Sequence, residues 1–450
     1  MGVYAPALLT EPDVHAIIGA SRTVLPFRQG TLGGTQTMTV AGQLFALTAA
    51  ARWRRSFTVG AFLAVLSLAP AYADPQPTLL WQHYPGSVKR DTGDAVAIDT
   101  LGNILVGGQT FGSIGRRDNN GTDAFVIKYS PDGEILWRRQ PGPARSERLR
   151  GLATDFADNV IAVGETNGAV GGPNRGLLDG FIVKYAADGK VQWKRQFGAA
   201  YGDTADAVAA DSAGNIIVVG VTDRAGPCCE TGDAIIIKYA ADGTETWRRT
   251  FDLTGSEEAT AVTTNAAGDI FVAGYTANAV LGPNFGTQDT FIARLAPDGT
   301  TRWVKQQMIS GDQLANGIAI DETGRLFLGG SQPNPTAGFY GGFVAAFSGS
   351  GAELWRRGFG GETAYDDAWS VAIDTAGHVL VSGSEAGETI MSSYARDGAL
   401  RWKISPQRFD RGGYAFLAAD GTDHVALVGT AEVSRAAGHW NANVARYDVD

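Results

Sequence analysis

The chain has 450 residues, of which 44% are hydrophobic and 60 are glycine, with only four methionines, and its formal net charge is −10. This apolar fraction suffices for a large core and excludes a disordered chain. Because the chain is acidic and has no basic stripe, we expect no nucleic-acid partner. Many glycines with scattered Val, Ile, Tyr, Phe and Trp are typical of short strands joined by turns.

The first feature along the chain is an export signal. Arg52, Arg54 and Arg55 precede the apolar run Phe57–Leu68, and the small-x-small motif Ala71–Ala73 follows it. A basic segment, a short apolar run and such a motif together form a secretory signal peptide. The apolar run is too short to span a bilayer comfortably as a permanent anchor. The alternative to a signal peptide is a buried helix.

This signal divides the chain into three segments. We expect residues 1–37 to be a non-structural extension and residues 38–73 to be the signal-peptide region, cleaved near Ala73. Residues 74–450 then form the mature protein. We expect it to be monomeric, without a membrane span, and secreted or periplasmic.

The mature segment contains one pattern seven times. Tryptophan recurs about every 50 residues, at Trp81, Trp137, Trp193, Trp247, Trp303, Trp355 and Trp402. Between two tryptophans lie a reverse turn, an apolar β run and a second β motif, as in Asp99–Asn103, Ile104–Gly108 and Asp123–Tyr129. A repeat of this length with four short strands is typical of a propeller blade.

The strands of the first complete blade can be assigned from these motifs. Strand a is Ala95–Asp99, strand b Ile104–Gly108, strand c Ala124–Tyr129 and strand d Glu134–Arg139. The connection Ser130–Gly133 has the Pro and Gly of a hairpin turn, so strands c and d pair. Strand a is rich in Ala and Gly in most repeats, as crowding near a propeller axis requires.

The two ends of the repeat region complement each other. Leu79–Trp81 matches strand d without a preceding a, b or c, and Asn443–Tyr447 matches strand c without a following d. Pairing them closes the ring and removes exposed sheet edges. We therefore predict an all-β, seven-bladed β-propeller of four-stranded antiparallel blades, in which the N-terminal strand completes the last blade.

The repeat also resembles a known family. Asp132–Trp137 (Asp-Gly-x-x-x-Trp), Asp123–Tyr129 (Asp-x-Phe-x-x-Lys-Tyr) and Gly102–Gly108 (Gly-Asn-Ile-x-Val-x-Gly) resemble the seven-bladed β-propeller repeats called SBBP repeats. The resemblance implies the fold and an exported bacterial setting, and it carries over no catalytic residues. Gly341–Phe347 and Glu388–Tyr394 depart from the pattern but keep its spacing.

The loops on one face are the first place to look for a ligand. The a–b and c–d turns are short and share one face, whereas the b–c loops and d–a crossings are long and share the other, which we call the long-loop face. Candidate ligand-binding residues in the b–c loops are Arg116, Arg117, Asn119, Asn120, Asn174, Arg175, Asn284, Phe285, Phe339, Tyr340, His439 and Trp440. The alternative is that these side chains only solvate the loops.

Acidic residues recur in the d–a crossings near the axis. Candidates for a metal site are Asp94, Asp203, Asp206, Asp312, Asp366 and Asp367. Carboxylate oxygens are ligands that Ca²⁺ prefers, so one hypothesis is a calcium ion at the mouth of the propeller, with no other cofactor. The alternative is that these acids stabilise turns through hydrogen bonds.

The only two cysteines, Cys228 and Cys229, are adjacent in a b–c loop. Three states stay open for them: a strained vicinal disulfide, two free thiols, or pairing with another molecule.

The sequence favours binding over catalysis. It contains no Gly-x-Ser-x-Gly, His-Glu-x-x-His or phosphate-loop motif. We expect a non-catalytic binding or scaffold module that takes a protein or a carbohydrate on the long-loop face. The alternative is a propeller enzyme, either a lyase or a quinoprotein-like dehydrogenase that uses pyrroloquinoline quinone. The segment Asp188–Trp193 superficially resembles the repeats of such quinoproteins.

Overall fold

The structure is a computed structural model. It describes residues 37–40, 43–46 and 75–449, except 115–120, 143–145, 225–231, 252–255, 278–285, 308, 335, 337, 410–413 and 435–438. The chain divides into two compact units, Met1–Ala69 and Pro70–Asp450. In the first unit, β1 (Thr37–Val40) and β2 (Gln43–Ala46) pair as an antiparallel hairpin. The rest of the expected extension and signal region lies outside the described residues.

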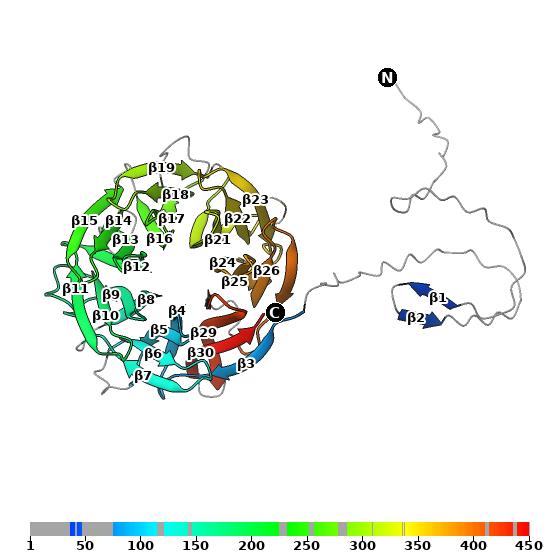
Figure 1. The fold of residues 1–450 in the computed structure, drawn as a ribbon, viewed down its shortest axis with the longest axis horizontal. Coiled ribbons are helices and arrows are strands. Elements are labelled where there is room, and N and C mark those ends of the chain that lie inside the picture. The colour runs from blue at the N-terminus through cyan, green and yellow to red at the C-terminus, as the bar shows by residue number, and fades with distance from the viewer. Residues whose placement is uncertain are drawn as a thin grey trace, which may run out of the picture. The chain divides into compact units, whose positions relative to one another are not determined.

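The second unit is built from four-stranded antiparallel sheets, seven of them over the described residues, arranged round a ring (Figure 1). From inner to outer strand, blade 1 is β4 (Asp91–Ile98), β5 (Ile104–Thr110), β6 (Asp123–Tyr129) and β7 (Ile135–Arg139); blade 2 is β8 (Glu147–Thr154), β9 (Val160–Thr166), β10 (Asp179–Tyr185) and β11 (Val191–Phe197); blade 3 is β12 (Gly202–Ala210), β13 (Ile216–Arg224), β14 (Asp233–Tyr239) and β15 (Glu245–Phe251). Blade 4 is β16 (Glu257–Thr264), β17 (Ile270–Thr276), β18 (Asp289–Leu295) and β19 (Thr301–Gln306); blade 5 is β20 (Leu314–Ile320), β21 (Leu326–Pro333), β22 (Tyr340–Phe347) and β23 (Glu353–Phe359). Blade 6 is β24 (Ala368–Ile373), β25 (Val379–Glu385), β26 (Glu388–Tyr394) and β27 (Leu400–Ile404); blade 7 is β28 (Ala415–Ala419), β29 (His424–Ser434), β30 (His439–Asp448) and β3 (Thr78–His83).

The ring closes as the sequence predicts. β3 pairs antiparallel with β30, with His83 opposite Val444 and Leu79 opposite Tyr447. The first strand of the propeller therefore supplies the outer strand of the last blade, and Figure 1 shows the two beside each other. This closure confirms the predicted fold class. Within the described ranges, no helix is long and apolar enough to cross a membrane.

The core lies between blades. Each hydrophobic cluster joins facing sides of two neighbours, as where Trp137 of blade 1 packs with Tyr185 of blade 2, their ring centroids 6.0 Å apart. Both side chains are buried. The repeated tryptophan is therefore a packing anchor, as the regular spacing indicates.

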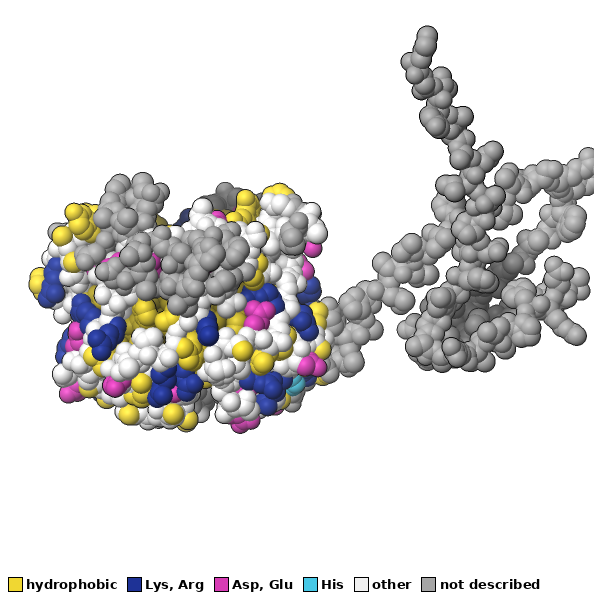
Figure 2. All heavy atoms as spheres, turned by 90° about the horizontal axis from the view of Figure 1, so that it is seen from above, with side chains coloured by type: hydrophobic (Ala, Val, Ile, Leu, Met, Phe, Trp, Pro, Cys, Tyr) yellow, Lys and Arg dark blue, Asp and Glu magenta, His cyan; other side chains and the backbone are white. Residues whose placement is uncertain are grey.

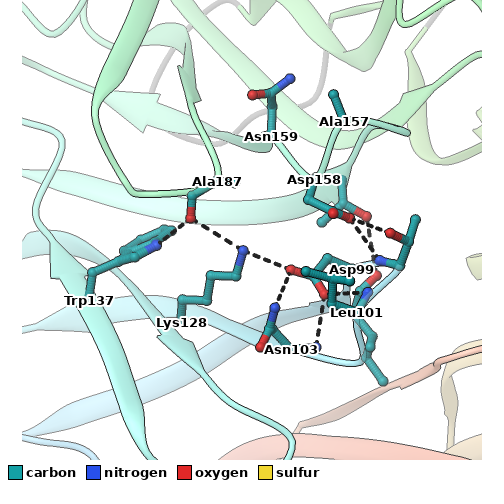
Figure 3. Close-up of polar contacts among 12 residues, drawn as sticks. Asp99, Leu101, Asn103, Lys128, Trp137, Ala157, Asp158, Asn159 and Ala187 are labelled. Atoms are coloured by element: carbon teal, nitrogen blue, oxygen red, sulfur yellow. Dashed lines mark hydrogen bonds and ion pairs between the residues drawn. The ribbon is translucent and has the colours of Figure 1, made fainter.

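A polar contact, which we call the inter-blade staple, links neighbouring blades on the short-turn face (Figure 3). The Asp99 carboxylate at the a–b turn lies 2.7 Å from Lys128 Nζ, and both side chains are buried. Lys128 Nζ and Trp137 Nε1 both donate to the Ala187 carbonyl in the c–d turn of the next blade, at 3.3 and 2.9 Å. One buried carboxylate thus orients a lysine that clamps the following turn.

The staple repeats and then lapses. Lys184 pairs with Asp155 at 2.8 Å, Lys238 with Asp211 at 2.9 Å and Arg294 with Asp269 at 2.5 Å. At the closure of the ring, Arg446 and Trp81 of blade 7 both donate to the Pro131 carbonyl of blade 1. In blade 5 the lysine position is held by Ala346, and among the described residues the buried Asp321 Oδ2 has no hydrogen-bond partner. Blade 5 is one of the two repeats whose sequences depart from the pattern.

The outer surface is mixed in character. Figure 2 shows basic, acidic and hydrophobic side chains intermingled on the side of the propeller. Exposed apolar residues recur on the outer strands, among them Leu80 on β3, Leu136 on β7 and Leu354 on β23.

Candidate ligand-binding mouth at the propeller axis

The inner strands share a backbone irregularity that creates the site. In the first six blades the pairing of the inner strand with its neighbour shifts at a matching position, apart from a further shift at the start of β12, and one residue at each matching position has no residue opposite it on the neighbouring strand. These bulged residues are Asp94, Arg150, Asp206, Thr260, Asn316 and Trp369. A β-bulge bends the strand and redirects a side chain, and bulges are common beside functional sites. β28 has no such shift.

All six bulged side chains line one cavity of about 400 Å³, which we call the axial mouth. β28 and the residue before it contribute Phe416 and Tyr414 to the same cavity. Among the other lining residues, Arg148, Glu258, Leu314, Asp367 and Tyr414 lie at or just before the starts of the inner strands, so the cavity lies toward the long-loop face. Its volume falls within the range of about 300–1,000 Å³ that is typical of ligand pockets.

One part of the axial mouth is charged. The Arg150 guanidinium lies 2.9 Å from the Glu165 carboxylate and 3.3 Å from that of Asp206. The hydroxyl groups of Thr92 and Thr204 donate to Asp94 and Asp206, respectively, the residues two positions further on. The charged groups of blades 1 to 3 are therefore held in place by their own strands and neighbours.

The next part of the ring is polar but uncharged at its bulges. Thr260 Oγ1 donates to the Ala315 carbonyl at 2.5 Å, and Asn316 Nδ2 donates to the Ala368 carbonyl at 3.0 Å. In the same blade as Thr260, the Tyr275 hydroxyl on β17 donates to the Glu258 carboxylate on β16 at 2.5 Å. The Thr260 and Asn316 bonds tie the inner strands of successive blades together, so the wall of the mouth is stiff.

Blades 6 and 7 form an aromatic arc. Trp369 is buried, whereas Tyr414 is 65% exposed, and their ring centroids lie 5.7 Å apart with planes tilted by 58°. Such a pair offers an incoming ligand a ring face at the rim. Asp367 stands next to this arc and also lines the mouth.

Two mouth carboxyls are poorly solvated. Burial raises the pKa of Asp94 above its ordinary value, although Arg148, the Thr92 hydroxyl and Arg150 oppose the shift. Burial likewise raises the pKa of Asp367, against a hydrogen bond from Ser331 and with a contribution from the neighbouring charge of Asp366. A raised carboxyl pKa means that the surroundings stabilise the charged form less well than water does.

The structure sorts the six acids of the metal hypothesis into two layers. Asp94, Asp206 and Asp367 line the axial mouth. Asp203 and Asp366 are fully buried elsewhere: Asp203 accepts hydrogen bonds from Ala199 N and Thr222 Oγ1, and Asp366 accepts from Gly361 N and Ala386 N. Asp312 accepts from Gln288 N and the Tyr340 hydroxyl. The second layer therefore orders loops.

No group of three or more His, Cys, Asp or Glu side chains suited to holding a metal ion occurs among the described residues. The calcium hypothesis stays a prediction.

The sequence also differs from the structure in where the inner strands begin. Strand a of blade 1 is expected from Ala95, but β4 begins at Asp91. The bulge is the reason, because one unpaired residue interrupts the alternation without ending the strand. Asp94 and Asp206 are consequently strand residues rather than loop residues.

The candidate ligand residues of the b–c loops that the structure describes do not line the axial mouth. Asn174 accepts a hydrogen bond from Gly176 N, and the Arg175 backbone donates to Asp179. Phe339 and Tyr340 contact Tyr365, with ring centroids 5.6 and 5.8 Å apart, as a separate aromatic cluster. The remaining candidates are Trp440, half-buried on β30, His439, whose side chain is not described, and Arg116, Arg117, Asn119, Asn120, Asn284 and Phe285, which lie outside the described residues.

Cys228 and Cys229 also lie outside the described residues. Their redox state, and the quinoprotein alternative that they partly support, stay predictions.

Several residues of the axial mouth were not predicted. Arg148, Arg150, Thr260, Asn316, Trp369 and Tyr414 carry no motif. One signal was present in the sequence: in six repeats the bulge falls five residues before the Asp or Asn that begins the a–b turn. At this position blade 6 has Trp369, a large aromatic residue in a strand that is otherwise rich in small residues, and this contrast could have indicated the site.

The fold and this mouth define the chain as a seven-bladed β-propeller, a class in which protein-interaction modules are common. The WD40 domain of Pan2 from Neurospora crassa matches it with a TM-score of 0.51 at 12% identity, over 83% of this chain and 96% of that domain, a likeness that shows the fold alone. Sqt1 from Chaetomium thermophilum matches with a TM-score of 0.46 at 11% identity, over 81% of this chain and 98% of that one.

At the level of sequence, the chain is similar to the regulatory protein FlaEY of Caulobacter vibrioides. The two are 24% identical over an alignment of 355 residues, and the match covers 66% of this chain and 37% of the relative. The chain thus spans little more than a third of the length of that relative. No family model matches the chain, so the SBBP resemblance is unconfirmed.

Proposed function

We propose that this chain is an exported, non-catalytic binding module whose ligand enters the axial mouth from the long-loop face. The observation that carries the proposal is the column of bulged residues. In six blades the inner strand has a β-bulge at a matching position, and all six bulged side chains line the axial mouth. A packing role alone would be met by the small residues beside them.

Two further points support a binding role. The propeller fold is commonly an interaction scaffold, and the curated relative is named a regulatory protein. The mouth also combines an apolar face with fixed charges, which is how ligand pockets provide both affinity and orientation. Export is supported by the segment of residues 52–73 and stays a proposal.

The binding proposal is tested by a matched pair of exposed aromatic residues. Tyr414→Ala removes a ring from the rim of the mouth, and Phe156→Ala removes a ring, 73% exposed, from an a–b turn on the opposite face. Both variants and the parent chain are screened against a glycan array and a peptide library. We expect ligands that bind the parent and the Phe156 variant but not the Tyr414 variant. Ligands that are lost equally in both variants contradict the proposal.

Export is tested separately with a reporter enzyme that is active only outside the cytoplasm, fused after Ala73. We expect activity that disappears when Phe57–Leu68 is deleted. A fusion that is inactive with or without the apolar run contradicts export.

A further inference from the structure

We infer that the axial mouth binds an organic cation, an alkylammonium or guanidinium group, either as a free amine or as a Lys or Arg side chain of a protein partner. The inference rests on the proposed function and names the chemistry of its ligand. It follows from the balance of charge in the mouth and from the position of the aromatic arc.

The charge balance of the mouth is negative. Four carboxylates line it, those of Asp94, Asp206, Glu258 and Asp367, against the two guanidinium groups of Arg148 and Arg150. Arg150 is already engaged by two carboxylates, one of which, Glu165, belongs to the neighbouring strand β9. A concave site lined by excess negative charge concentrates cations.

The aromatic arc lies between two of these carboxylates. In the order of blades round the ring, Asp367 and Trp369 of blade 6 are followed by Tyr414 of blade 7 and then by Asp94 of blade 1. The face of an aromatic ring attracts a cation, and most strongly when the cation is desolvated. A carboxylate on each side of the ring pair supplies the counter-charge.

The same arrangement favours an organic cation over a metal ion. Ca²⁺ needs six to eight oxygen ligands around it, whereas one side of this mouth presents Trp369, Tyr414 and Phe416. An alkylammonium or guanidinium group is larger, weakly hydrated at its carbon atoms, and able to contact ring faces and carboxylates together. The cavity of about 400 Å³ has room for such a group and its alkyl stem.

The weak solvation of Asp94 and Asp367 is consistent with this ligand. Burial raises the pKa of both carboxyls, because their surroundings stabilise the charged form less well than water does. A bound cation would oppose that shift by pairing with the charged form.

The test compares a cation with its neutral isostere. Choline and 3,3-dimethylbutan-1-ol have nearly the same shape and differ in charge, and isothermal titration of the full chain measures both. We expect choline to bind and the alcohol to bind at least tenfold more weakly. Equal affinities, or binding of neither, overturn the inference.

Variants place the binding site. We expect Asp367→Asn and Tyr414→Leu each to weaken choline binding by about tenfold, the size of one lost charge or ring contact. Phe156→Leu is the matched control and should leave affinity unchanged. Circular dichroism confirms that each variant is folded. Unchanged choline affinity in both mouth variants overturns the inference.

Two further arms separate the sources of the cation. If n-butylammonium and a lysine-containing pentapeptide bind equally, the ligand is a free amine, whereas at least tenfold tighter binding of the peptide indicates a protein partner. Failure of the inference also differs from failure of the proposed function. A neutral glycan that binds the parent chain but not the Tyr414 variant overturns the organic cation and leaves the binding mouth standing.

Discussion

Removing the lysine of one inter-blade staple should destabilise the whole ring. In the staple of blade 2, Lys184 Nζ lies 2.8 Å from Asp155, with side chains 2% and 5% exposed, and donates to the Ala241 carbonyl of blade 3 at 3.2 Å. Lys184→Met keeps the length of the side chain and leaves the carboxylate buried without its cation. Breaking a buried pair in this way costs about 3–5 kcal/mol.

The lower end of that range is expected here. Asp155 keeps hydrogen bonds from Ala157 N, from Asn159 N and from the Asn159 amide, all between 2.9 and 3.0 Å. A loss of about 3 kcal/mol is a large share of the roughly 5–15 kcal/mol by which a domain is stable. Urea unfolding followed by tryptophan fluorescence would show it as a lower midpoint.

The matched control is Lys190→Met, which removes an exposed lysine paired with Asp188. It should leave the urea midpoint unchanged, because solvent screens this ion pair. A Lys184 variant that unfolds at the same urea concentration as the control would refute the role assigned to the staple.

Four further outcomes follow from the structure. Burial raises the pKa of Asp155, but the contacts with Lys184 and Asn159 outweigh burial and hold this pKa below its ordinary value. The charged carboxylate therefore stabilises the fold above about pH 4, and this stabilisation is lost at lower pH. The difference in urea midpoint between the parent and Lys184→Met should accordingly narrow below about pH 4. Gly189 and Gly324 both have positive φ, but a Cβ at Gly189 would lie 2.8 Å from the Trp137 ring and one at Gly324 would meet nothing within 4 Å, so Gly189→Ala should cost more stability, and equal thermal shifts would contradict this. Deleting residues 75–83 should lower the melting temperature and expose β30 to aggregation, and the same segment added as a peptide should restore the melting temperature; a deletion variant as stable as the parent would contradict closure by β3. Because one side of the mouth presents aromatic rings instead of oxygen ligands, Ca²⁺ against a chelator should leave the melting temperature unchanged, whereas a rise with Ca²⁺ would support the metal hypothesis from the sequence.

The fold could be predicted from the sequence because the same motifs recur from blade to blade. Each repeat contains the same kind of turn, β run and tryptophan, so the departure at Ala346 does not obscure the pattern. The match of Leu79–Trp81 to an outer strand predicted the closure that β3 and β30 make. Local turn chemistry and ring topology agree throughout.

The axial mouth was only partly readable. Asp94, Asp206 and Asp367 were noticed as acids near the axis, but Asp203 and Asp366, close to them in sequence, face backbone amide groups instead. Asp203 and Asp206 lie on the same strand and Asp366 and Asp367 are adjacent, so the sequence does not separate the two layers, and the bulge that holds Asp94 and Asp206 has no motif of its own. Trp369 reaches the cavity because it occupies the matching bulge.

The pairing of β3 with β30 has a consequence for how the chain folds as it is made. Within the propeller, β3 is synthesised before every other strand and must wait for β30, so blade 7 cannot assemble before β30 has been produced. Contacts so distant in sequence are slow to form. If the protein is exported, the ring stays open until β30 has been produced, and a chain whose ring is still open can pass through a narrow translocation channel.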